Sequence, residues 1–497
     1  MEFHTLLKNL NTKSFFSDLI IERGIEKESL RIDRNGFISK SDHPKSLGSS
    51  YTNSSITTDF AESLIEIVTP TYTNIDELYG KLKAIHVFIN QNLNDGEMLW
   101  PFSMPPRIGT ESDIKIATYG RTNMGKLKHV YRRGLAIRYG KTMQCVSGIH
   151  YNFSIADRSF KQLGCMSQED RNTAYLDLIR NFKRLFWFVL IEFGSSPVVD
   201  KSFVADRDND LDSLNKTDLF KLNATSLRMS DIGYQSKAQK NLNFKYNDLD
   251  TFLLELKKAI VNPYPEFKNL GLKDNENNFQ QISNGILQIE NELYDCIRPK
   301  RAGESSQRPY ELLKNQGIQY VEVRGIDLNP SEAIGISKEQ IRLLDLLLIY
   351  CLITPSSKMT NEEKIKIEQQ DVSVIKSGRD PNIPIIFKNK ETKIASARDE
   401  LIEDLRKLAY EFKDNSFIDA VNNLGDFRKN EFKQDKSFHD IGLNRAIENH
   451  QLLNSFSNID VRLCEKEAGE SLKEFDKINL KQEIAFDDFI ETYNSKI

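Results

Sequence analysis

The sequence predicts an α+β protein whose strands, of the kind found in antiparallel sheets, each have one polar face. Helix and strand signals are mixed along the chain, and no internal repeat is present. Four segments alternate polar and aliphatic side chains with a period of two, which is typical of a strand with one wet face in an antiparallel sheet. A single strand of this kind is commonly just a solvent-exposed sheet surface. Four in one chain favour a polar-lined cleft.

Composition limits the class of protein. The 497 residues carry 68 basic and 72 acidic side chains, a net charge of −4, so bulk positive charge cannot hold the chain on nucleic acid. With only 24 Gly and 14 Pro, a fibrous or collagen-like protein is excluded. The chain is long enough for a substantial core and, by length alone, for two or three domains.

Three further observations predict a cytoplasmic enzyme in a reducing compartment. The most apolar stretch, residues 185–191, is far shorter than the roughly 20 residues of a membrane-spanning helix. The first residues lack the basic and apolar regions of a secretory signal. The five cysteines are odd in number and include no CxxC pair, so we expect neither a disulfide framework nor a cysteine zinc site.

Two helices are predicted in the first part of the chain. Apolar residues recur every three or four positions over 74–93, and Asn74 is placed to cap the helix. Over 171–193 the apolar character runs nearly all round, so this helix should be buried.

The four predicted strands are 20–30, 144–154, 287–294 and 318–324. Aliphatic side chains occupy one face of each strand. The polar faces carry, in chain order, Glu26 and Glu28; Gln144, His150 and Asn152; Gln288, Glu290, Glu292 and Tyr294; and Tyr320, Glu322 and Arg324.

The C-terminal third differs in character. Residues 1–355 are expected to form the catalytic core. The segment 356–395 is polar and rich in turn residues, so we interpret it as a connection or excursion. Residues 396–497 show a charged helical pattern and are expected to pack on the core as a helical region.

One apparent nucleotide motif is excluded. Residues 120–126 match the start of a phosphate-binding loop, but Leu127 replaces the required Ser or Thr and no apolar strand precedes the match.

Acidic residues indicate a metal site. Glu26 and Glu28, then the group Asp59, Glu62 and Glu66, and finally Glu322 would crowd carboxylates into a small volume if they share one sheet. Mutual repulsion would raise their pKa values unless cations neutralise them. Mg²⁺ is the natural partner of such oxygen ligands, and an added His150 nitrogen would also suit Mn²⁺. Taken alone, His150 is more often a structural residue.

Basic residues indicate phosphate binding. Arg298, Lys300 and Arg301 are close together in the sequence RPKR, although an exposed basic turn is the common alternative. Arg324 lies two residues from Glu322 on the same predicted strand, so both side chains point into one space, either as part of a site or as an isolated salt bridge. Arg and Lys clamps stabilise transferring phosphoryl groups.

A collinear series of motifs from about residue 20 to 350 closely resembles the bacterial glutamate–cysteine ligases of the proteobacterial type. The motifs include RGIEKESLR, ITTDFAESLIEIVTP, WPFSMPP, YRRGLAIRYG, QCVSGIHYNFS, ATSLRMSDIGY, IENELYDCIRPKR and YVEVRGIDLNP. Residues after 355 share only a general helical character with that family.

The resemblance implies a fold similar to glutamine synthetase, with a curved antiparallel sheet, and an activity. That family joins L-glutamate to L-cysteine with ATP as co-substrate, the first step of glutathione biosynthesis. It implies Mg²⁺, for which Mn²⁺ can substitute, small-molecule substrates only, no nucleic acid or membrane partner, and a monomer.

The resemblance also implies roles by position. The metal ligands would be Glu26, Glu28, Asp59, Glu66, His150 and Glu322, with Glu62 a less certain addition. Asp59 and Glu66 are seven residues apart and would face opposite sides of a regular strand, so either a bulge intervenes or Glu66 alone is a ligand. The catalytic phosphate-binding groups would be Arg298, Lys300 and Arg324. The cysteine-binding residues would be Phe60, Tyr131, Gln144, Arg228, Tyr234 and Tyr294.

Two other functions remain open. The chain could be another γ-glutamyl–amine ligase of the same superfamily, which a screen of amines would detect. It could also be a metal-dependent hydrolase or phosphatase built on the same carboxylates, which would turn over without ATP.

Overall fold

The main sheet organises the fold. In the computed structural model, which describes residues 3–205, 207–233, 236, 238–304, 306–425 and 436–497, this sheet has seven strands in the order β2-β3-β1-β5-β10-β9, with β4 paired to the end of β1. Every pairing is antiparallel. Its strands are β1 (Ile21–Ile32), β2 (Ile56–Thr58), β3 (Leu64–Val68), β4 (Met98–Leu99), β5 (Ile149–Ile155), β9 (Ile297–Lys300) and β10 (Tyr320–Ile326).

Helices and two small sheets surround it. The helices are α1 (Phe3–Thr12), α2 (Phe15–Asp18), α3 (Ile75–Asn92), α4 (Asn123–Tyr139), α5 (Asp157–Gln162), α6 (Gln168–Phe193), α7 (Lys201–Val204), α8 (Leu249–Val261), α9 (Pro265–Leu270), α10 (Pro309–Gln316), α11 (Lys338–Ile353), α12 (Asn361–Ser377), α13 (Ile394–Ala409), α14 (Ser416–Asn422), α15 (Phe438–Ser455), α16 (Arg462–Asn479) and α17 (Phe486–Ser495). The small sheets contain β6 (Val198–Asp200), β7 (Asp212–Ser213) and β8 (Asp218–Phe220), and β11 (Pro384–Phe387) with β12 (Lys390–Lys393).

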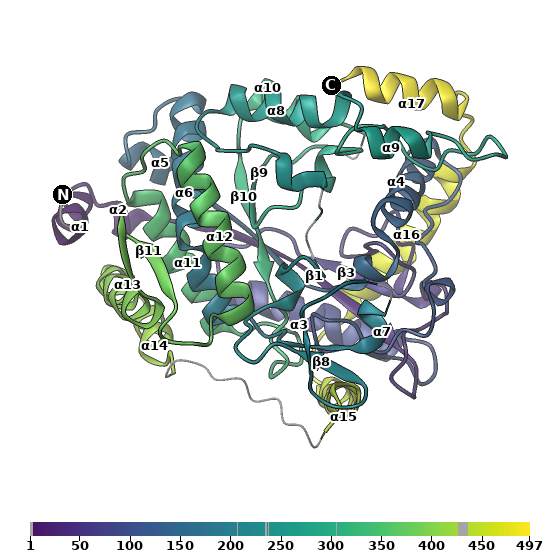
Figure 1. The fold of residues 1–497 in the computed structure, drawn as a ribbon, viewed down its shortest axis with the longest axis horizontal. Helices are drawn as coiled ribbons and strands as arrows, with labels where there is room; N and C mark the ends of the chain where they lie inside the picture. The colour runs from purple at the N-terminus through teal and green to yellow at the C-terminus, as the bar shows by residue number, and fades with distance from the viewer. Residues whose placement is uncertain (1–2, 206, 234–235, 237, 305, 426–435) are drawn as a thin grey trace.

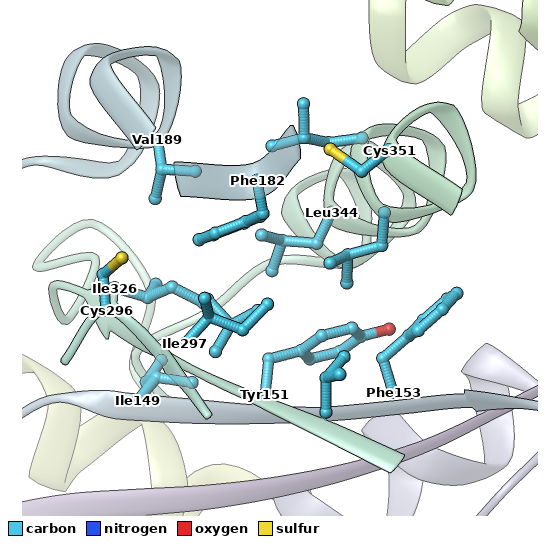
Figure 2. Close-up of a cluster of buried hydrophobic side chains, with 14 of the residues drawn as sticks. Ile149, Tyr151, Phe153, Phe182, Val189, Cys296, Ile297, Ile326, Leu344 and Cys351 are labelled. Atoms are coloured by element: carbon cyan, nitrogen blue, oxygen red, sulfur yellow. The ribbon is translucent and has the colours of Figure 1, made fainter. Parts of the chain in front are cut away.

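The apolar face of the sheet forms the core. Ile149, Tyr151 and Phe153 point from β5 toward Phe182 of α6 and Leu344 of α11 (Figure 2). All five side chains are completely buried. This packing fixes which face of each strand is available for chemistry, because neighbouring side chains on a strand point to opposite faces.

The polar face looks toward a different set of elements. In Figure 1, α6, α11 and α12 lie on one side of β9 and β10, while α4 and α16 lie on the other. The strand register brings acidic and polar residues side by side on the polar face: Glu28 is opposite Glu66, Glu26 is opposite His150, and Glu322 is opposite both Asn152 and Arg298.

Both predicted helices are confirmed. The side chain of Asn74 accepts hydrogen bonds from the first turn of α3. Helix α6 begins three residues earlier than predicted, because Ser167 and Asp170 form a capping box there. Among the helices that the structure describes, none is long and apolar enough to cross a membrane.

Two strand predictions are corrected. The strand expected over 144–154 begins only at Ile149, and Gln144 lies in a 3₁₀ turn before it. The prediction of a strand over 287–294 is wrong, because a 3₁₀ turn covers Glu290–Glu292. The backbone N–H of Gln288 donates to the carboxylate of Glu292 at 2.8 Å, which closes a local turn in place of a sheet ladder.

The C-terminal third is helical, as expected for residues 396–497, which contain most of α13 and all of α14 to α17. The segment 356–395 folds into α12, the β11–β12 hairpin and the start of α13. An ion pair of 2.6 Å between Arg184 and Glu363 ties α12 to α6. The division into a core, a connection and a helical region remains a prediction. All five cysteines are free.

Candidate active site

A cavity of about 290 Å³ lies on the polar face of the sheet. Strands β1, β3, β5, β9 and β10 supply one wall and helix α4 another. The sequence-predicted residues that line it are Glu26, Glu28, Asp59, Phe60, Glu66, Tyr131, Gln144, His150, Arg228, Tyr294, Arg298, Lys300, Glu322 and Arg324. The structure thus brings together residues almost 300 positions apart in the chain.

Two candidate residues are placed differently. The carboxylate of Glu62 accepts hydrogen bonds from the backbone and hydroxyl of Thr118, both at 2.9 Å, and from the backbone of His43. It is not among the residues that line the cavity, so the structure does not support its addition to the metal ligands. Tyr234 lies outside the described residues.

A hairpin reconciles Asp59 with Glu66. Strand β2 ends at Thr58 and β3 begins at Leu64, and the N–H of Asp59 donates to the carbonyl of Leu64 at 3.0 Å. The two residues therefore do not share one regular strand, as the expected choice between a bulge and a single ligand assumed, because a turn separates them, and which of them is a ligand remains a prediction. Both side chains line the cavity.

One end of the cavity is acidic. Burial raises the pKa of Glu66 well above its ordinary value, and the charges of Asp59, Glu26 and Glu28 raise it further, while Arg132 opposes them. Burial also raises the pKa of Glu28, with Asp59 adding to the effect against His150. Crowded carboxylates of this kind are stabilised in their charged form by added cations.

The other end is basic. Glu322 is buried and contacts Arg298 at 2.9 Å, Lys300 at 3.3 Å and Arg324 at 3.1 Å. Burial alone would raise the pKa of Glu322, but these three cations hold it well below its ordinary value. Glu322 is thus a clustered carboxylate that neighbouring cations neutralise, the exception that the sequence analysis allowed.

His150 lies between the two ends. Its Nδ1 is 3.1 Å from a carboxylate oxygen of Glu26 and its Nε2 is 3.6 Å from one of Glu28. Burial and Glu322 raise the pKa of Glu26, but His150 and Lys300 outweigh them and the net shift is downward. Ligand atoms of Glu26, His150 and Glu322 lie within 4.8 Å of one another, a spacing and donor set that fit one divalent ion.

The remaining wall is partly aromatic. Phe60, Tyr131 and Tyr294 line it, and the hydroxyl of Tyr294 is 3.4 Å from the amide of Gln144. Arg228 is held by an ion pair of 2.8 Å to Asp327.

A glycine permits this arrangement. A Cβ on Gly148 would lie 2.7 Å from the Arg228 guanidinium, so a larger residue would require the guanidinium to shift. The N–H of Gly148 donates to Glu28 at 2.8 Å and so orients that carboxylate.

Helix α4 adds two cationic residues that the sequence reasoning missed, Lys128 and Arg132. Burial and the nearby Arg132 lower the pKa of Lys128 to about 8, although Glu66 opposes the shift. Lys128, Tyr131 and Arg132 are spaced i, i+3 and i+4, the spacing of one helix face, and this signal could have identified both cations from Tyr131.

Comparisons with known proteins agree with this geometry. The family described as glutamate-cysteine ligase matches residues 5–374. A glutamate–cysteine ligase from Hahella chejuensis is 45% identical over 372 residues, 74% of this chain and 71% of the relative. One from Shewanella pealeana is 37% identical over 501 residues, 95% of each chain.

Solved structures give the same result. The structure of a glutamate–cysteine ligase from Francisella tularensis in complex with AMP matches with a TM-score of 0.91 and 31% identity, covering 96% of this chain and 98% of the other, which confirms the expected fold. A bifunctional glutathione synthetase from Pasteurella multocida (TM-score 0.66, 20% identity, covering 100% of this chain and 59% of the other) shares the fold alone. From its sequence and its fold together, this chain belongs to the glutamate–cysteine ligase family.

Proposed function

We propose that this chain joins the γ-carboxyl group of L-glutamate to the amine of L-cysteine at the expense of ATP, giving γ-glutamylcysteine, ADP and phosphate. One observation carries the proposal: a single cavity holds crowded carboxylates at one end and three cations at the other, with His150 between them. A relative with the same fold was solved with AMP, which supports a nucleotide substrate.

The basic end is suited to phosphoryl transfer. An oxygen of the glutamate γ-carboxylate attacks the γ-phosphorus in line, the bond to ADP breaks, and γ-glutamyl phosphate forms. Arg298, Lys300 and Arg324 surround Glu322, so they are already gathered where phosphate oxygens would take up their charge. Such preorganised cations stabilise charge in the transition state without further rearrangement.

The acidic residues fit divalent metal. Glu26, Glu28, Asp59, Glu66, His150 and Glu322 would hold Mg²⁺, or Mn²⁺ in its place, since they offer oxygen donors and one imidazole. A bound ion of this kind neutralises charge on phosphate oxygens. The raised pKa of Glu66 supports a local need for added positive charge.

The second step forms the amide. The cysteine amine attacks the acyl carbon, the carbon–oxygen bond to phosphate breaks, and the amine proton passes to the leaving phosphate or to a carboxylate. Phe60, Tyr131 and Tyr294 form an aromatic wall that would hold the cysteine side chain, with Gln144 beside Tyr294. A closed wall also keeps water from the acyl phosphate.

We also propose that the chain, of 57.3 kDa, acts as a monomer in the cytoplasm. Free cysteines and a substrate that is itself a thiol support a reducing compartment. Light scattering should therefore give a single species near the chain mass.

A coupled assay of ADP release tests the function. With Mg²⁺, ATP and L-glutamate, ADP should form slowly, and L-cysteine should accelerate it with one γ-glutamylcysteine formed per ADP. Acceleration by a different amine, with L-cysteine inert, would favour another γ-glutamyl ligase. Turnover of a phosphate ester or amide without ATP would favour a hydrolase.

A further inference from the structure

A second and larger cavity lies against a wall of the active site. Its volume is about 480 Å³, within the range of about 300–1,000 Å³ typical of small-molecule sites. Helices α6 and α12, which contact each other, line it together with residues 293–296 and with Met229, Ser236, Gln239, Lys240, Leu242 and Phe244. Figure 1 shows these two helices side by side, away from α4. The apolar lining is Phe186, Met229, Leu293, Ile365, Val372 and Ile375.

Tyr294 belongs to both cavities. Its hydroxyl meets Gln144 at 3.4 Å on the active-site side. Its backbone N–H donates at 2.9 Å to Gln239, which lines the second cavity only. A ligand in the second cavity would therefore contact the back of the aromatic wall without entering the active site.

The buried end of this cavity holds two carboxyl groups and one lysine. Lys183 pairs with Asp295 at 2.5 Å, and the other oxygen of Asp295 accepts from the hydroxyl of Tyr246 at 2.7 Å. Asp371 is a second carboxylate near the same lysine. Its Oδ1 is buried and has no hydrogen-bond partner among the described residues.

The other charged groups of the lining do not change this balance. Glu368 is matched by Lys364 at 2.5 Å, and Lys240 is exposed. Burial raises the pKa of Asp371 well above its ordinary value, and Asp295 and Glu368 add to this effect while Lys183 opposes it. An ionised carboxylate in an apolar enclosure is costly unless a cation or donor accompanies it.

We propose that this cavity binds a small organic cation, with its charged nitrogen on Asp371 and its apolar body between α6 and α12. The ammonium supplies the hydrogen-bond donor and the positive charge that Asp371 lacks. The apolar residues bury the rest of the ligand. On binding, the carboxyl proton of Asp371 passes to solvent and the ligand keeps its own charge. The proposal is independent of the ligase reaction, because no residue named for that reaction has to change.

Calorimetry with 2-phenylethylammonium tests the proposal on the full chain, without substrates. The wild type should bind it in the millimolar range or tighter. 2-Phenylethanol, which has a similar shape but no charge, should bind at least about tenfold more weakly. Titrations in two buffers of different ionisation enthalpy should differ in heat, because a proton is released. Equal affinity for the two probes, or no binding of the amine at 10 mM, would overturn the proposal.

Three variants locate the probe. Asp371→Asn should weaken amine binding at least about tenfold. Val372→Lys, at an exposed rim position, should do the same by placing a like charge at the mouth. Glu362→Gln removes an acid from the same helix at a position outside the lining and should leave the affinity unchanged. Asp371→Asn with unchanged affinity and an unchanged unfolding temperature would sink the idea, and Val372→Lys gives an independent reading if Asp371→Asn fails to fold.

Discussion

The two ends of the active-site cavity use the same residue type in opposite electrical settings. Glu66 at one end and Glu322 at the other both point from the polar face of one sheet. The pKa of Glu66 is raised by burial and neighbouring acids, whereas three cations hold that of Glu322 well below its ordinary value. Glu66 is thus the stronger base of the two and Glu322 the weaker one, although both lie on the same face.

This difference suits the two ends of the cavity to ligands of opposite charge. The acidic end gains from cations brought in from solution, and the basic end has cations that phosphate oxygens can share. His150 contacts acids of the first end and lies 3.5 Å from Arg324 of the second. In the proposed reaction, a substrate with a metal-bound phosphate group would span both ends, so we expect similar substitutions to have different effects at the two ends.

The largest effect is expected at the acidic end. Glu66→Gln should lower kcat/KM for ligation on the order of 10³-fold or more, because even an outer-shell partner of a metal ligand is worth about 10–100-fold. Steady-state ADP release at saturating Mg²⁺ measures it. Glu62→Gln is the matched control from the same motif and should stay within a few-fold of wild type, since Glu62 does not line the cavity. Near-normal activity of Glu66→Gln would remove Glu66 from the metal site.

Stability should change most at the basic end. Glu322→Gln leaves three buried or half-buried cations without their counter-charge, and breaking a buried pair costs about 3–5 kcal/mol. Urea unfolding at pH 7 without metal should show this loss of unfolding free energy. Glu66→Gln should show no loss or a gain under the same conditions. Equal changes in the two variants would refute the contrast between the ends.

Arg324→Lys tests phosphoryl transfer. The substitution keeps the charge and loses the planar fork of donors. We expect kcat to fall by about 10²-fold, the range for loss of a transition-state donor. Single-turnover formation of ADP measures the step directly. A change confined to the KM for cysteine would place Arg324 in the amine subsite instead.

The aromatic wall should select the amine. Sulfur gains roughly 0.3–1.5 kcal/mol against an aromatic ring. A serine hydroxyl without a partner costs about 1–3 kcal/mol to bury. Wild type should therefore prefer cysteine to serine by about 10- to 1,000-fold in kcat/KM, and L-2-aminobutyrate should be a usable substrate. Tyr294→Ala should reduce this preference by about tenfold. Equal turnover of serine and cysteine by wild type would disprove the selection.

The smallest effect is a pH dependence of stability in the absence of metal. The pKa of Glu66 in the folded state is raised above its ordinary value of 4.5. This shift contributes stability that is fully present below pH 4.5 and is lost as the pH rises through the folded-state pKa. The unfolding temperature in EDTA should therefore fall more steeply above pH 4.5 in wild type than in Glu66→Gln. Excess Mg²⁺ should flatten the wild-type curve. Parallel curves for the two proteins would contradict the assignment.

The sequence by itself indicated three of the seven strands of the main sheet, and the helices α3 and α6. The alternation around Glu26, His150 and Glu322 identified β1, the later part of β5, and β10, because a period of two is a local property of each strand. The same alternation over 287–294 failed, since a side-chain hydrogen bond closing a turn leaves no trace in the pattern. The family motifs gathered the candidate residues, and their roles remain predictions.

Only the tertiary structure decided where each acidic residue lies and which charges surround it. Glu62 and Glu66 are close in sequence, yet Glu62 is held by Thr118 and Glu66 lines the cavity, because Glu62 lies in the hairpin turn and Glu66 lies on strand β3. The opposite pKa shifts of Glu66 and Glu322, and the position of Asp371 in the cavity behind the aromatic wall, arise from segments far apart in the chain. Composition and periodicity fix which face of a strand is polar, but an ionisable group takes its pKa from whatever the fold places within a few ångströms of it.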